Sequence, residues 1–154
     1  MSFTFIEKVL GSGSVTAVCT PSSAPSTGEL IIASLGTGNA LETDITLPSG
    51  FIIADSLEAS SRTVVIAYKI ATGSEPSSYS FSTTSGNLAV TLEIWSAGGT
   101  VGVGNTTGLL ATSAASITAG PLTVGVGNLL VMGAFYNSFG GSLSFSDSFI
   151  NPGD

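Results

Sequence analysis

Residues Leu88–Ser96, with the sequence LAVTLEIWS, carry the clearest structural signal in this chain. Aliphatic side chains occupy every second position of the run, namely Leu88, Val90, Leu92 and Ile94. Successive side chains of a β-strand point to opposite faces, so a period of two predicts a strand with its aliphatic face in a core. The intervening positions, which include Glu93 and Trp95, are expected to face away from that core.

The segment just before this run alternates in the same way. Tyr79, Phe81 and Thr83 share one face of Tyr79–Thr83, and serines occupy the other face. The link Thr84-Ser85-Gly86-Asn87 supplies residues that tolerate a positive φ angle, as tight turns require. We therefore expect the two runs to pair with each other as a β-hairpin.

Short apolar or alternating runs, closed by turn residues, recur along the whole chain, and helix signals are missing. The other segments predicted as strands are Phe3–Leu10, Ser14–Cys19, Leu30–Leu35, Phe51–Ala54, Thr63–Ile70, Leu129–Phe135 and Ser142–Phe149. The Gly-rich stretch Gly98–Thr112 fits either a weak edge strand or a long loop. About eight to ten strands without helices predict an all-β fold, a two-sheet antiparallel β-sandwich of jelly-roll type.

Several of these segments carry more specific expectations. Phe3–Leu10 and Ser14–Cys19 are expected to form a first hairpin, joined by the Gly-Ser-Gly link between them. Leu30–Leu35 and Leu129–Phe135 are expected to be central strands. Thr63–Ile70, TVVIAYKI, is β-branched and almost continuously apolar, so both of its faces are expected to be covered.

The composition fits one domain over residues 1–154, and the apolar content of 43% is ample for a core. Charge is scarce, because 8% of the residues are Asp, Glu, Lys or Arg, against roughly 25% in an average soluble domain. A surface of neutral polar side chains repels other copies weakly, which predicts a chain that works inside an assembly. The alternative is a monomer that a Ser/Thr surface keeps soluble.

The charge balance argues against nucleic acid as a partner. The net charge is −7, and the three cations are Lys8, Arg62 and Lys69. Phosphate binding depends on clustered cations that release counterions, and three scattered cations form no cluster. We therefore predict no nucleic-acid partner.

No segment points to a membrane or to secretion. The N-terminal MSFTFIEKVLGSGS lacks the basic start and the apolar run of a signal peptide. The longest nearly unbroken apolar stretch, Leu129–Tyr136, is far shorter than the roughly 18 residues of a spanning helix. Cys19 is the only cysteine, so no intrachain disulfide is expected, and a free thiol suits assembly in a reducing cytoplasm.

Catalytic machinery is hard to assemble from this composition. Without a histidine, the Ser-His-Asp and Cys-His constellations and most zinc sites are excluded. Cys19 has no imidazole to activate it and is expected to be a small buried apolar residue. Glu93 beside Trp95 could serve a glycosidase or a sugar-binding site, which pairs a carboxylate with an aromatic platform. The plainer interpretation is that Glu93 points outward or pairs with Lys69.

Two further patterns have features of ligand sites. Glu42 and Asp44 are two residues apart, so they share one side and could hold a cation through oxygen ligands. A solvated loop face is the plainer interpretation of this pair. Gly102-Val-Gly104 lacks the third glycine and the following lysine of a phosphate loop. We therefore predict no catalytic residues, no metal ion and no cofactor.

One part of the chain resembles a known family. The residues are, in order, Ser26–Ala33 (STGELIIA), Leu47–Phe51 (LPSGF), Val65–Ala71 (VIAYKIA), Ser74–Phe81 (SEPSSYSF) and Leu92–Ser96 (LEIWS). This order resembles β-sandwich domains of tailed-bacteriophage virion proteins, whose runs read like GDLLVA, PSGW, YYKVA, EPASYTF and YSGV. The resemblance covers about Ser26 to Gly98. Phe51 stands where the family often carries Trp, and these strand and turn signatures specify fold better than function.

The resemblance implies a non-enzymatic structural protein of a virion. Related domains occur in tail fibres, capsid decoration proteins and bacterial surface repeats. The leading hypothesis is a capsid cement or decoration protein, a jelly-roll homotrimer on the outer surface of the phage head, assembled in the bacterial host cytoplasm. Such a protein would bind the major capsid protein over junctions between capsid subunits.

The N-terminal residues are the expected assembly contact. Phe3 and Phe5 lie within residues 1–10, which could form a docking arm that reaches the capsid shell. The alternative for the same residues is a first strand in the core of the domain.

Two other functions stay open from the sequence. The first is a receptor- or carbohydrate-binding module of a tail fibre or adhesin, with a glycan bound through Trp95 or Glu93. The chain has no stalk, heptad or collagen-like run, which counts against a fibre component. The second is a hydrolase, which would need two carboxylates that face each other across a cleft.

Overall fold

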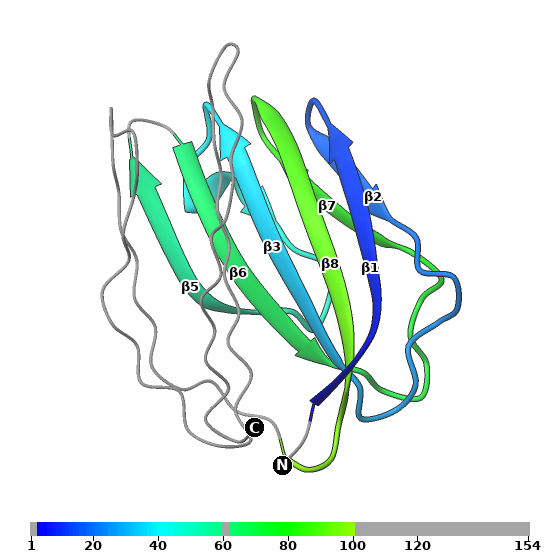
Figure 1. The fold of residues 1–154 in the computed structure, drawn as a ribbon. Helices are drawn as coiled ribbons and strands as arrows, with labels where there is room; N and C mark the ends of the chain where they lie inside the picture. The colour runs from blue at the N-terminus through cyan, green and yellow to red at the C-terminus, as the bar shows by residue number, and fades with distance from the viewer. Residues whose placement is uncertain (1–2, 60–61, 101–154) are drawn as a thin grey trace, which may run out of the picture.

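The computed structural model describes residues 3–59 and 62–100, and these residues form eight strands and one short helix (Figure 1). The elements are β1 (Phe3–Gly13), β2 (Thr16–Cys19), β3 (Leu30–Gly38), the 3-10 helix η1 (Glu42–Asp44), β4 (Ile45–Thr46), β5 (Ile52–Ala59), β6 (Arg62–Ile70), β7 (Tyr79–Thr83) and β8 (Asn87–Ala97). The strands predicted at Leu129–Phe135 and Ser142–Phe149 lie outside the described residues. So does most of the ambiguous stretch Gly98–Thr112.

Two antiparallel sheets build the fold. The larger sheet has five strands in the order β1-β8-β3-β6-β5, and the smaller has three in the order β2-β7-β4. In Figure 1 the five-stranded sheet is in front, and β2 and β7 lie behind its β1 and β8. The prediction of a two-sheet antiparallel β-sandwich is confirmed, while the jelly-roll type stays a prediction.

The core lies between the two sheets, where the predicted faces meet. The alternate residues Leu88, Val90, Leu92 and Ile94 of β8 are at most 3% exposed. Tyr79 and Phe81 of β7 are equally well buried, and Phe51 packs edge-on against both rings. The period of two therefore predicted the core-facing side of both strands correctly.

The hairpin predicted between Tyr79–Thr83 and Leu88–Ser96 is wrong. β7 pairs with β2 and β4, whereas β8 pairs with β1 and β3, so the two segments lie in opposite sheets. Their link is a corner between the layers. Gly86 adopts a φ of 81° there, and a Cβ atom on it would overlap the carbonyl oxygen of Gly38. The turn residues were identified correctly, but a turn that permits positive φ does not decide which strands pair.

The predicted first hairpin is wrong for the same reason. β1 continues through Gly11 and Gly13, which were expected to form a turn, and it pairs with β8. The chain then crosses to the other sheet, where β2 pairs with β7. Two alternating segments with a short link fit a corner as well as a hairpin, because both arrangements bury one face of each strand.

The central strand of the larger sheet is β3, as predicted for Leu30–Leu35. Seven of its nine residues are buried, on both faces of the sheet. β6 differs from its prediction, because only its inner face is fully buried, at Thr63, Val65 and Ala67. The alternate residues of β6 are partly exposed. The nearly continuous apolar sequence of β6 therefore overestimated the burial of its outer face.

Candidate interaction surface

The one ion pair among the described residues joins Lys69 at the end of β6 to Glu75 in the following loop. The Nζ–Oε2 distance is 2.9 Å, and the Glu75 side chain is 0% exposed. The same carboxylate accepts hydrogen bonds from the backbone N–H of Thr72 at 2.8 Å, the Thr72 hydroxyl at 3.0 Å and the Tyr79 hydroxyl at 2.9 Å. Lys69 also donates to the Ser49 carbonyl oxygen at 3.2 Å.

These contacts control the ionisation of the network. Burial acts to raise the pKa of Glu75, but hydrogen bonds from Lys69, Thr72 and Tyr79 outweigh it and lower the pKa to about 2. Burial and the neighbouring carboxylate raise the pKa of Tyr79 well above its ordinary value. Glu75 is therefore ionised near neutral pH, and its contacts fix a loop. This network contains residues on which the family resemblance depends, and its geometry indicates a structural role.

Glu93 and Trp95 lie on the outer side of β8, as the alternation predicted. The Trp95 indole Nε1–H donates to the Glu93 carboxylate at 3.1 Å, and Phe5 packs edge-on against the indole with ring centroids 5.1 Å apart. Lys69 pairs with Glu75 instead of Glu93, so that suggested pairing is not formed. The carboxylate and the aromatic platform are thus brought together on the sheet surface.

Cys19 is buried in β2 as a free thiol. Burial raises its pKa to about 11, so the thiol stays protonated near neutral pH. This environment agrees with the expectation of a small buried apolar residue.

Glu42 and Asp44 lie in η1, but their carboxylates serve local hydrogen bonds. Asp44 accepts from the backbone N–H of Leu41 at 2.9 Å, and Glu42 accepts from the Ser56 hydroxyl. The backbone N–H of Glu42 donates to Glu58. Within residues 3–59 and 62–100, no group of three or more His, Cys, Asp or Glu residues is arranged to hold a metal ion.

Exposed large apolar side chains concentrate at the side of the sandwich formed by β1 and β2. Nine such side chains are exposed among the described residues, and five of them belong to this side: Phe5, Ile6, Leu10, Val15 and Val18. Figure 1 shows β1 and β2 side by side at this end of the two layers. Leu10 is the most exposed of the nine, at 71%.

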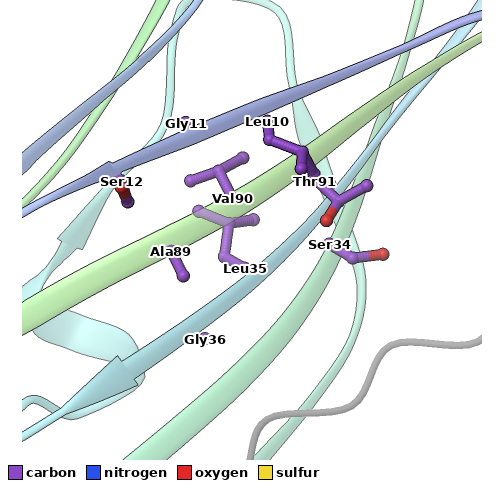
Figure 2. A pocket seen from close by; sticks show the side chains of 9 residues that line it. All are labelled: Leu10, Gly11, Ser12, Ser34, Leu35, Gly36, Ala89, Val90 and Thr91. Carbon is purple, nitrogen blue, oxygen red and sulfur yellow. The ribbon is translucent and has the colours of Figure 1, made fainter. Parts of the chain in front are cut away.

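A shallow groove of about 320 Å³ adjoins Leu10 on the outer face of the larger sheet (Figure 2). Small side chains form much of its surface, because Ser12, Ala89 and Gly36 are neighbours across β1, β8 and β3. Figure 2 shows Leu10 and Thr91 beside each other in the same region. The groove holds hydroxyl groups but no ionisable side chain, so its surface suits a neutral contact.

The predicted assembly residues Phe3 and Phe5 both lie in β1, where Phe3 is partly exposed and Phe5 is 49% exposed. Residues 3–10 thus belong to the first strand, which lies at the edge of the larger sheet and has no buried residue, so they do not form a strand in the core. The sequence did not single out Ile6, Leu10 and Val18, which are also exposed at this edge of the sandwich. The sequence of Phe3–Leu10 contains several apolar residues, but it does not show which of them lie outside the sheet.

No known family model, no curated protein and no solved structure matches this chain. Among the described residues, no helix has the length and apolar character that a membrane span requires. The candidate surface therefore rests on its own chemistry: an apolar side formed by β1 and β2, next to a neutral groove and an aromatic pair.

Proposed function

We propose that this chain is a non-enzymatic structural protein of a bacteriophage virion, a cement or decoration protein that binds the capsid over junctions between capsid subunits. The exposed apolar side of β1 and β2 is the observation that supports the proposal most directly. Phe5 and Leu10 face outward from the larger sheet and Val18 faces outward from the smaller one, so exposed apolar residues occur on both layers at this edge of the sandwich. In a domain with few charges, such residues suit burial against another protein. The resemblance of Ser26 to Gly98 to phage virion domains supports the same class.

In this proposal the N-terminal end of β1 contacts the major capsid protein. Phe3 and Phe5 are at the start of an edge strand, and Phe5 is supported from one side by Trp95. Aromatic anchors of this kind supply much of the energy of a protein interface when a partner excludes water from them. The resemblance implies a homotrimer on the outer surface of the phage head, and the number of copies is open to direct measurement.

The test is to locate the chain on purified phage particles by mass spectrometry and by imaging of the head. Particles with the Phe5→Ser variant are expected to lose most of the bound chain, because the variant removes an exposed aromatic contact. Ile52→Ser, which changes an exposed residue on the opposite edge strand β5, is the matched control. A chain that is missing from the head in the unmodified phage would refute the proposal.

A glycan-binding module is the second candidate function, and the Trp95–Glu93 arrangement favours it. An indole held in place by a carboxylate resembles the stacking platform and hydrogen-bond acceptor that a sugar needs. A glycan array with the unmodified chain and with Trp95→Ala tests this candidate. Specific glycan binding that Trp95→Ala abolishes would favour it over the capsid proposal.

A further inference from the structure

β1 is an edge strand of the larger sheet. One of its two backbone edges pairs with β8, and no described strand pairs with the other edge. An unpaired edge presents N–H and C=O groups that a further strand can join. Natural edge strands usually carry a charge, a proline or a bulge that prevents pairing with another chain. The residues along β1 therefore indicate which part of this edge could pair with a further strand.

A β-bulge divides β1 into two parts. The register with β8 shifts between Phe5 and Glu7, which leaves Ile6 as an extra residue. After the bulge, Glu7–Gly13 pairs with β8 in an unbroken register. The extra residue of a bulge inverts the alternation of inward-facing and outward-facing side chains. A strand that paired with β1 in one unbroken register across Ile6 would therefore place inward-facing residues opposite outward-facing ones. Any further pairing along β1 is therefore confined to one side of Ile6.

The part after the bulge is complementary to itself. In an antiparallel pair of two copies, directly opposite residues must point to the same side of the sheet. The longest pairing of Glu7–Gly13 that meets this condition places Leu10 opposite Leu10 of the second copy. Val9 then faces Gly11, Lys8 faces Ser12, and Glu7 faces Gly13. A pairing centred on Val9 or on Gly11 would include only five residues of each copy, instead of the seven that the centre at Leu10 includes.

The charges agree with this register. Glu7 and Lys8 are the only charged residues of the segment, and each faces an uncharged residue of the other copy. No like charges are opposed, and the most exposed apolar side chain, Leu10, meets its own copy at the centre. Directly opposite side chains on one face of an antiparallel pair are close enough to contact each other, so the two Leu10 side chains would pack together.

The surface is large enough for a modest interface. Seven residues span about 24 Å, and two packed sheets are roughly 20 Å thick with their side chains, which gives about 500 Å² for each copy. Two copies would bury about 1,000 Å², near the lower limit for a specific interface.

We propose that Glu7–Gly13 pairs with the same segment of a second copy of this chain, across a two-fold axis at Leu10. The pairing joins the two five-stranded sheets into one continuous antiparallel sheet. It leaves the N-terminal end of β1, with Phe3 and Phe5, outside the paired segment. A two-fold pair differs from the homotrimer that the family resemblance implies, and the inference does not depend on a role in the capsid.

The first test is the mass of the full chain, measured by light scattering after size exclusion over a wide concentration range. The expected mass at high concentration is twice 15.3 kDa. Leu10→Asp places two like charges opposite each other and is expected to give the monomer mass. Ile52→Asp is the matched control, because Ile52 is also exposed and lies on the opposite edge strand, and it is expected to keep the double mass.

The second test uses the two-fold axis directly. Leu10→Cys is expected to form a disulfide between two copies under mild oxidation, because residue 10 meets itself. Ser12→Cys alone, and Lys8→Cys alone, should cross-link poorly, whereas a mixture of the two should cross-link well. Cys19 is buried and stays out of the reaction. Circular dichroism melting checks that each variant is folded, and Leu10 is exposed enough for its substitution to leave the core intact.

Several results would overturn the inference. A monomer at every concentration, a trimer, or equal effects of Leu10→Asp and Ile52→Asp would each contradict it. A Leu10→Cys variant that forms no intermolecular disulfide under oxidation would contradict it as well. None of these masses bears on whether the chain is present on phage heads, so failure here is distinguishable from failure of the proposed function.

Discussion

Glu75 shows how a domain with few charges can bury one of them. A carboxylate that loses its water is costly unless other groups replace the hydrogen bonds of the solvent. Lys69, Thr72 and Tyr79 provide four donors to this carboxylate, two of them from Thr72. These hydrogen bonds hold the loop between β6 and β7 against the end of the smaller sheet. The bond from Tyr79 also ties the start of β7 to this loop.

The lowered pKa of Glu75 predicts a specific pH dependence of stability. The pKa falls from 4.5 to about 2 on folding, so the unfolded chain binds more protons than the folded one between these values. The stabilisation is complete above pH 4.5 and is lost as the pH falls toward 2. It amounts to about 3 kcal/mol. We expect the free energy of unfolding of the unmodified chain to fall by about that much more than that of Glu75→Gln between pH 6 and pH 2.

Urea unfolding at a series of pH values measures this difference. The comparison of the two variants removes the contributions of the other carboxylates, which both chains share. Tyr79→Phe removes one of the four donors and is expected to reduce the difference without abolishing it. Parallel pH profiles for the unmodified chain and Glu75→Gln would show that the network does not control acid stability.

Cys19 gives a second prediction at the residue scale. Because burial raises its pKa to about 11, the reactive thiolate is scarce at pH 8 and the sulfur is also inaccessible. We expect a thiol reagent such as dithionitrobenzoate to react slowly with the folded chain at pH 8 and rapidly in denaturant. Fast reaction of the folded chain would contradict the buried position of Cys19 in β2.

At the scale of elements, the close approach of β1 and β2 depends on Gly11. A Cβ atom on Gly11 would lie 2.7 Å from the carbonyl oxygen of Val18 and 2.9 Å from the sulfur of Cys19. Gly11→Ala is therefore expected to push the two layers apart and to lower the free energy of unfolding by about 1–3 kcal/mol. Chemical denaturation measures this value.

Gly73→Ala is the control for this prediction, because the nearest atom to its Cβ is the Thr27 hydroxyl oxygen at 3.3 Å. We expect it to change stability much less than Gly11→Ala. An equally mild effect of both substitutions would mean that β1 and β2 can separate at little cost. That result would also weaken the description of β1 and β2 as one continuous side of the sandwich.

At the scale of the whole molecule, β3 should be the most stable element. It lies at the centre of the five-stranded sheet, has a strand on each side and is buried on both faces. We expect its backbone amides to exchange hydrogen more slowly than those of the edge strands β1 and β5, since exchange from the centre requires opening of the sheet. Hydrogen exchange read by mass spectrometry checks this order. Faster exchange in β3 than in β5 would contradict it.

The sequence determined the local features of this protein. The alternation in Leu88–Ser96 and Tyr79–Thr83 predicted both strands and their buried faces, because side-chain direction repeats every two residues within one strand. The recurring short apolar runs between turn residues predicted an all-β chain, and Phe3 and Phe5 were candidate contact residues. The sequence left open whether these two residues belong to a docking arm or to a strand in the core, so their exposure did not follow from it.

Tertiary structure decided which strands pair and which apolar residues stay outside. β7 and β8 follow each other in the chain yet lie in opposite sheets, and β1 and β2 do the same. Pairing partners are set by contacts between distant segments, such as β1 with β8, and no short-range pattern encodes such contacts. The bulge at Ile6 and the exposure of Leu10 depend on the same register, so the interaction surface could be recognised only once the sheets were assembled.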